Sequence, residues 1–366
     1  MVKQAVTVKQ AVTVKQDLKK EMDNKVVSIL YSLISDVPFI KLKYVKSNVR
    51  PKTRAEETII KVLVSGKPVK FIVESKSQGE PRIIRAAAAE LKAYLQSYQD
   101  SYGIIAATYI SDAGRQICKE AGIGCIDLAG NVFLSFENIF IEKSGRPNLF
   151  PVSRLSRSVF SPKSSRILRV LLSDPSKRWY VEDLSLEAGI SIGLTSRVKQ
   201  ALLAEEWIGE ENKRFYLTNP NEVLDQWVQN YSYSKNHSFS FYSGLRDDQI
   251  ETVIRSECEK RNHQYALALF SGAGKVAPFV RFMKFFSYVD RDIEAIARSL
   301  QLRKVESGAN VMLLQPYDAG VFYGLQDING IKVVSDIQLY LDLKSYRGRG
   351  EEAAQAIFEQ RIKPKW

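Results

Sequence analysis

The residue types and spacing that could support chemistry occur first at Glu74 and Lys76, which are separated by one residue in a predicted strand. Side chains two residues apart in a strand project from the same face of the sheet. A carboxylate at such a position can hold a magnesium ion, while a lysine can orient the attacking water or stabilise a charged transition state. The pair is therefore a candidate for metal-dependent cleavage of a phosphodiester. Only in that case do we expect a cofactor, Mg²⁺, and we expect no other metal site.

The elements predicted around this pair supply a scaffold for such chemistry. Residues 17–110 are expected to form a helix, three strands, a helix and a strand, an order that resembles the restriction-endonuclease-like fold. Residues 74–76 look like the E-x-K half of the PD-(D/E)xK nuclease motif. Such nucleases also carry an acid on the preceding strand, but residues 58–64 contain none. The motif is incomplete, so a nuclease-like scaffold kept for binding is the alternative to a nuclease with catalytic residues Glu57, Glu74 and Lys76.

A second group of informative residues lies between 163 and 219. Apolar residues at helical spacing predict a first helix from residue 163 and a second, short helix from 181. Gly189 permits a tight turn, and Ser191 can cap a third helix that extends to about residue 204. Alternating residues then predict a two-stranded hairpin that ends at residue 217. This order predicts a winged helix-turn-helix.

A winged helix has a physical use, because a helix fits the major groove and nearby cations reach phosphates. We expect the third helix to bury Ile192 with its other apolar residues and to expose its polar side. The same fold also docks proteins, so a non-enzymatic interaction adaptor is an alternative. The residues expected to contact DNA are Thr195, Ser196, Arg197 and Lys199 on the helix, Lys213 and Arg214 on the wing, and Arg154, Arg157, Lys163 and Arg166 beside it.

The charge of the chain favours a polyanionic partner, nucleic acid before membrane. The 366 residues carry a net charge of +12, and nine cations lie between Lys143 and Arg178 with Asp174 as the only acid. The three cysteines form no CxxC pair and there are two histidines, which argues against a zinc site and predicts buried, reduced thiols. No apolar run has the length of a membrane span, so we expect a soluble, cytoplasmic protein associated with the nucleoid.

The composition and the predicted elements divide the chain into five parts. Together they predict an α/β multidomain protein with two α/β domains on either side of the winged helix. The predicted parts are a flexible basic repeat (1–16), the restriction-endonuclease-like domain (17–143), a basic linker (144–162), the winged helix-turn-helix (163–220) and a C-terminal α/β domain (221–366).

The C-terminal domain contains a glycine-rich segment, residues 271–278, that we expect to be a turn. Its spacing is too short for a Walker motif, and Val276 stands where that motif needs a hydroxyl. The domain resembles a degenerate nucleotidyltransferase instead. The strand that follows offers Asp290 at its end, and Asp292 falls in the next helix, so two-metal phosphoryl transfer lacks its ligands.

Several segments together carry a resemblance to one family, the AbiEi-type antitoxins (abortive infection, type IV toxin–antitoxin systems). The resemblance covers about residues 70–366, and its most specific part is Gln338-Leu-Tyr-Leu-Asp-Leu followed by Gly348-Arg-Gly. The segments that carry it are 127–131, 162–207, 270–278, 306–318, 334–343 and 348–354.

The resemblance implies a transcriptional regulator that binds double-stranded DNA and represses its own operon. It also implies a nucleotidyltransferase-like toxin, encoded nearby, that the antitoxin opposes without a stable complex. A homodimer would suit a palindromic operator. The N-terminal α/β domain distinguishes this chain from the short members of the family.

Overall fold

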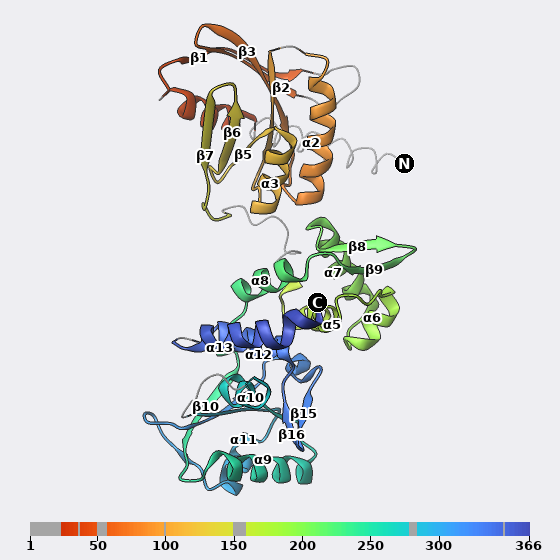
Figure 1. Cartoon of the computed structure of the whole chain (residues 1–366), viewed down its shortest axis with the longest axis vertical. Helices are drawn as coiled ribbons and strands as arrows, with labels where there is room; N and C mark the ends of the chain where they lie inside the picture. The colour runs from red at the N-terminus through yellow and green to blue at the C-terminus, as the bar shows by residue number, and fades with distance from the viewer. Residues whose placement is uncertain are drawn as a thin grey trace, which may run out of the picture. The chain divides into compact units, whose positions relative to one another are not determined.

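The computed structural model describes residues 23–35, 37–49, 57–98, 100–148, 159–277, 284–346 and 348–366. The chain divides into two compact units. The first comprises Met1–Arg154 with Ala204–Glu206, and the second comprises Leu155–Leu203 with Trp207–Trp366. Both contain a seven-stranded sheet and helices, which confirms the α/β class (Figure 1). The predicted basic repeat and residues 149–158 of the predicted linker lie outside the described residues.

The sheet of the first unit keeps its strands in chain order. Strand β4 is parallel to both of its neighbours, β3 and β5. The other adjacent pairs of strands are antiparallel. The strands are β1 (Ile40–Val49), β2 (Glu57–Val64), β3 (Lys67–Ser75), β4 (Ser101–Ala107), β5 (Gly124–Asp127), β6 (Val132–Phe136) and β7 (Ile139–Lys143).

Helices cover both faces of this sheet. The helix at residues 23–35 packs on one face, while α2 (Pro81–Leu95) and α3 (Asp112–Ala121) pack on the other, so that two apolar clusters flank the strands. Local signals delimit α3, because the Ser111 side chain accepts from the Gly114 amide and Gly122 adopts a φ of 72°. The resulting order, with one helix before and one after the β1–β3 meander, is the predicted one.

The second unit begins with the predicted three helices and hairpin. They are α5 (Ser165–Ser173), α6 (Val181–Glu187), α7 (Ile192–Ala204), β8 (Ile208–Glu211) and β9 (Arg214–Leu217). Trp179, between α5 and α6, pairs with Phe215 in an isolated antiparallel bridge beside the hairpin. Helix α8 (Pro220–Asn230), capped by Asn219, leads into the rest of the unit.

A mixed sheet forms the C-terminal part of the second unit, in the order β13-β10-β14-β12-β11-β16-β15. Helices α9 (Asp247–Arg261) and α11 (Ile293–Ser299) pack on one face, and α10 (Leu269–Val276), α12 (Asp336–Lys344) and α13 (Gly350–Ile357) lie on the other (Figure 1). The strands are β10 (His237–Tyr242), β11 (Tyr265–Leu267), β12 (Phe285–Val289), β13 (Arg303–Lys304), β14 (Val311–Gln315), β15 (Gln326–Ile328) and β16 (Ile331–Val333).

The predicted turn at residues 271–278 is wrong, because most of this segment belongs to helix α10. Its small residues serve packing. A Cβ atom on Gly272 would lie 2.7 Å from Leu339 Cδ2 and 2.9 Å from the Leu267 carbonyl oxygen, so only glycine lets α10 approach α12 and β11 this closely. All three cysteines are free and buried, as predicted.

Candidate nucleic-acid interface

Local sequence signals position helix α7. Gly189 has a φ of 61°, which lets the chain turn sharply after α6, and Ser191 Oγ accepts a 3.4 Å hydrogen bond from the Leu194 amide at the start of α7. Helix α7 contains no Asp or Glu. Its buried residues Val198 and Leu202 join the apolar cluster that also contains Trp179 and Phe215. The helix is thereby fixed against the hairpin with one arc of its surface outward.

The outward arc of α7 spans about 140° at 100° per residue. Its members combine one apolar side chain, one glycine, two neutral polar side chains and one cation. They are Ile192, Gly193, Ser196, Arg197 and Gln200, of which Ser196 is partly exposed and the others are exposed. Two of the predicted base-contacting residues, Ser196 and Arg197, therefore lie on one surface. The same surface includes three residues that were not predicted to contact DNA, namely Ile192, Gly193 and Gln200.

Three predictions for α7 are wrong. Thr195 has 0% exposure, and its hydroxyl donates to the Ser191 carbonyl oxygen at 3.1 Å. Lys199 has 9% exposure, and its Nζ lies 2.6 Å from Glu210 Oε1 and over the Phe215 ring. Ile192, predicted to be buried, is 52% exposed. The hairpin packs against Lys199, and the sequence of the helix alone does not show where a neighbouring element will cover it.

The hairpin turn displays the predicted wing cations. Asn212 and Lys213 have φ values of 51° and 65°, the left-handed conformation that two-residue hairpin loops require. Lys213 and Arg214 are both exposed. The Arg214 guanidinium lies 4.7 Å from the centre of the Tyr180 ring, which holds it beside the start of α6.

The predicted row of backbone-contacting cations is only partly available. Lys163 is exposed, whereas Arg154 and Arg157 lie outside the described residues. Arg166 was predicted to contact the DNA backbone, but its guanidinium is engaged within the protein. Its Nε and Nη2 donate to the two carboxylate oxygens of Asp318 at 2.8 and 2.9 Å. Residues 163–219 contain nine Lys or Arg and eight Asp or Glu, a formal charge of +1. The positive surface is therefore local to α7 and the wing.

The predicted catalytic pair lies in the first unit. Glu74 is 3% exposed, and its Oε1 lies 2.7 Å from Lys76 Nζ, which confirms that the two side chains share a face of the sheet. Glu57 is the first residue of β2, one position beyond the register pair of Thr58 with Val73, and its side chain lies outside the description. In the described part of the chain, no group of three His, Cys, Asp or Glu side chains could hold a metal ion.

Asp290 and Asp292, the two acids considered in the C-terminal domain, both have hydrogen-bond partners in the fold. Asp290 follows β12 and accepts from the Gln264 amide, and Asp292 lies 2.9 Å from His263 Nε2. These two carboxylates therefore have internal partners in the fold.

Comparison with known proteins finds a match within the second unit. Residues 216–363 match the family model described as "Transcriptional regulator, AbiEi antitoxin, Type IV TA system". This part of the chain is similar to the AbiEi antitoxin family, and we call residues 216–363 the AbiEi-family region. The match begins within β9, so α5, α6, α7 and the first unit lie outside it. No curated protein and no solved structure matches the chain. None of the described helices is long and apolar enough to span a membrane.

The AbiEi-family region holds α5 through a buried polar network. Arg169, on α5, is 2% exposed; its Nη2 donates to Gln338 Oε1 at 2.6 Å, and its guanidinium stacks 4.9 Å from the centre of the Trp227 ring. Gln338 Nε2 donates in turn to the Tyr231 hydroxyl and to Asp342 Oδ1, both at 2.8 Å. Gln338 and Asp342 belong to the segment in which the sequence resemblance is most specific, and they act here as a structural link.

Asp342 is the centre of this network. Its carboxylate accepts hydrogen bonds from the hydroxyls of Tyr231 at 2.5 Å and Tyr288 at 3.1 Å. Complete burial raises the pKa of Asp342 from 3.8 to about 7, against the opposing effects of the hydrogen bonds and of Arg169. The network is therefore sensitive to the protonation of one carboxyl group.

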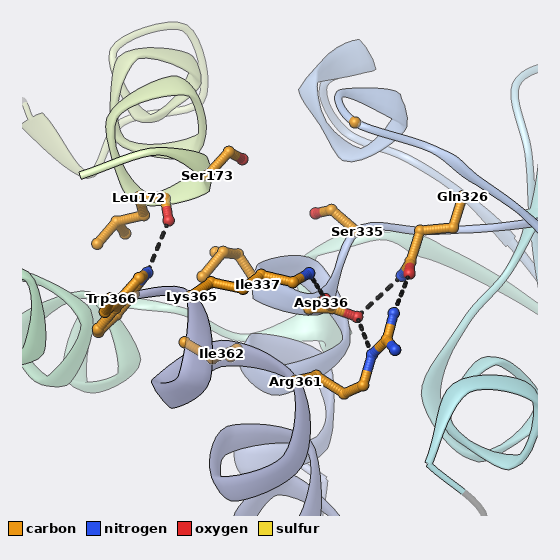
Figure 2. A pocket seen from close by; sticks show the side chains of 11 residues that line it. Leu172, Ser173, Gln326, Ser335, Asp336, Ile337, Arg361, Ile362, Lys365 and Trp366 are labelled. Atoms are coloured by element: carbon orange, nitrogen blue, oxygen red, sulfur yellow. Dashed lines mark hydrogen bonds and ion pairs between the residues drawn. The ribbon is translucent and has the colours of Figure 1, made fainter. Parts of the chain in front are cut away.

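The C-terminal residues that follow the AbiEi-family region make a second contact with α5 (Figure 2). Trp366 Nε1 donates to the Leu172 carbonyl oxygen at the end of α5, at 3.1 Å. Asp336 accepts from Lys365 Nζ at 2.6 Å and from Arg361 Nε at 3.4 Å, beside a pocket of about 180 Å³. Helix α5 is thus held at two places, by the buried network around Gln338 and by the hydrogen bond from Trp366. The core that supports α7 includes α5 and is held with it.

Proposed function

We propose that this protein is a sequence-specific, double-stranded DNA-binding transcriptional regulator of the type IV antitoxin kind that represses its own operon. Residues 163–220 act as its winged helix-turn-helix, with α7 in the major groove and the β8–β9 hairpin as the wing. The observation that carries the proposal is the acid-free helix α7, whose outward arc presents Ser196, Arg197 and Gln200. The family of the region to which it is fastened supports the same reading.

Each group on this surface has a defined role in the proposal. Arg197 and Ser196 read base edges, and an arginine side chain can donate two hydrogen bonds to one guanine. Lys213 and Arg214 contact phosphates from the wing, and Lys163 does so beside α5. The regulator works in the cytoplasm at the nucleoid, and a homodimer would place two α7 helices on a palindromic operator.

Binding to the duplex upstream of the protein's own gene, measured by fluorescence anisotropy across a salt series, tests this function. We expect affinity to fall steeply with salt, by a slope of about 0.9 per phosphate contact. Arg197→Ala should weaken binding by about 1–3 kcal/mol through the lost base contact. The matched control is Arg246→Ala, which removes an exposed arginine of the C-terminal domain. A flat salt dependence, or equal affinities for the two variants, would contradict the proposal.

The antitoxin role concerns a nucleotidyltransferase-like toxin encoded nearby. We propose that this protein opposes the toxin by repression and without a stable complex. Co-expression should relieve toxin-induced growth arrest, while affinity purification of the tagged regulator should recover no toxin. A stable complex, or relief that persists without the operator, would rule out this route.

A metal-dependent nuclease targeted by the winged helix is the second candidate function. The β1–β3 meander followed by parallel β4 supports a restriction-endonuclease-like domain, and the Glu74–Lys76 pair lies on it. The fit to Mg²⁺ is incomplete, because Mg²⁺ takes several oxygen ligands and Glu74 is a single buried carboxylate paired with a lysine. Plasmid cleavage with Mg²⁺ or Mn²⁺ that disappears in Glu74→Gln and Glu57→Gln would support it, whereas cleavage unchanged in both variants would exclude this site.

An interaction adaptor is the third candidate, favoured by one observation. Leu186, on α6, is 81% exposed and Tyr180 is 38% exposed, which is typical of a surface that another protein covers. Co-purification of a protein partner after nuclease treatment, lost in Leu186→Ala, would support this function over DNA binding.

A further inference from the structure

Ile192 is an exposed isoleucine that neither the core nor the helix explains. It is the first residue of α7 and is 52% exposed, outside the apolar cluster that Val198 and Leu202 join. A β-branched residue also has a lower helix propensity than alanine. About half of the surface of Ile192 is therefore available to a ligand.

The neighbours of Ile192 indicate what kind of ligand fits. Gly193 beside it has no side chain, and the space where a Cβ atom would lie is open, so a partner can approach the backbone closely. Ser196, one turn along, and Arg197 are polar. The start of this acid-free helix thus presents one apolar group next to hydrogen-bonding groups. A ligand with a complementary surface would be polar except for scattered methyl groups.

The major groove of DNA is such a surface. Its base edges are polar, with the exception of the 5-methyl group of thymine, and apolar side chains at the start of a recognition helix contact that methyl. We infer that Ile192 is a specificity-determining residue that packs against the 5-methyl group of a thymine. The inference rests on the proposed DNA-binding function and adds to it one position of the target sequence.

Removal of the methyl group alone tests this contact. The probe is the duplex that this protein enriches from a random-sequence pool, prepared once with thymine and once with uracil, which differs only by lacking the 5-methyl. Burial of one methyl group is equivalent to about a fourfold change in Kd, so the full-length protein should bind the thymine duplex at least about fourfold more tightly. Ile192→Ala should bind the two duplexes equally, and Ile192→Val should retain part of the preference.

Leu186→Ala is the matched control, since it also shortens an exposed aliphatic side chain near α7 and should keep the thymine preference of the wild type. Equal binding of both duplexes by the wild type would overturn the inference while leaving DNA binding intact. A preference that survives in Ile192→Ala would also overturn it, because the methyl would then be read elsewhere. If no duplex is enriched at all, the proposed function fails, and the inference fails with it.

Discussion

Replacement of Arg169 by methionine tests whether the buried network fastens α5 to the AbiEi-family region. Methionine has a flexible, apolar side chain that can occupy most of the space of the arginine stem. The substitution therefore removes two main interactions, the 2.6 Å hydrogen bond to Gln338 and the stack on Trp227, together with a 3.1 Å hydrogen bond to Ser165 Oγ, and leaves little cavity.

The expected cost can be worked out from these two contacts. A hydrogen bond from a charged donor contributes about 1.5–3 kcal/mol, and a desolvated cation–π contact contributes about 2 kcal/mol. Gln338 Oε1 also loses its buried donor. We therefore expect Arg169→Met to lower the free energy of unfolding by about 4 kcal/mol.

Tryptophan fluorescence in urea is a suitable assay, because all four tryptophans of the chain lie in the second unit. The signal thus reports that unit without interference from the first. Arg178→Met is the matched control, since Arg178 also combines an ion pair, with Glu211, and a ring contact, with Tyr216, but at an exposed site. Solvent screens such a surface pair, so this control should change the urea midpoint little.

A shift for Arg169→Met that is no larger than that of the control would refute the reasoning. The network would then be a consequence of packing and not a cause of stability. A change in the slope of the unfolding transition would point to altered cooperativity between α5 and the family region.

Three further predictions follow from single residues. Lys213→Ala should reduce the salt slope of DNA binding by about 1 and weaken all duplexes alike, as expected for a phosphate contact; a sequence-dependent loss would contradict this role. Because the pKa of Asp342 is raised from 3.8 to about 7 in the folded state, its contribution to stability is complete below about pH 4 and is lost as pH rises through about 7. The stability of the wild type relative to Asp342→Asn, from urea unfolding, should therefore fall over that window, and a constant difference would exclude the effect. Gly272→Ala should cost about 1–3 kcal/mol in the same assay, since its Cβ would lie 2.9 Å from the Leu267 carbonyl oxygen; an unchanged midpoint would show that α10 can shift.

The features that sequence reasoning found depend on neighbouring residues in the chain. Ser111 and Gly122 delimit α3, and Gly189 with Ser191 separates α6 from α7, because caps and left-handed turns act within a few residues. The E-x-K spacing likewise placed Glu74 and Lys76 on one face of β3. Hairpin β15–β16 was missed, since its strands of three residues each are too short for an alternating pattern.

The sequence by itself determined the order of the elements, the acid-free composition of α7 and the resemblance of the C-terminal region to the AbiEi antitoxins. Tertiary structure decided which side chains are available. The β8–β9 hairpin covers Lys199 and supplies Glu210 as its partner, and Asp318, distant in sequence, engages Arg166. Ile192, at the start of α7, remains 52% exposed. Helical periodicity gives the direction in which a side chain points from its own helix. Whether that side chain is exposed depends on which other elements of the fold pack against that side of the helix.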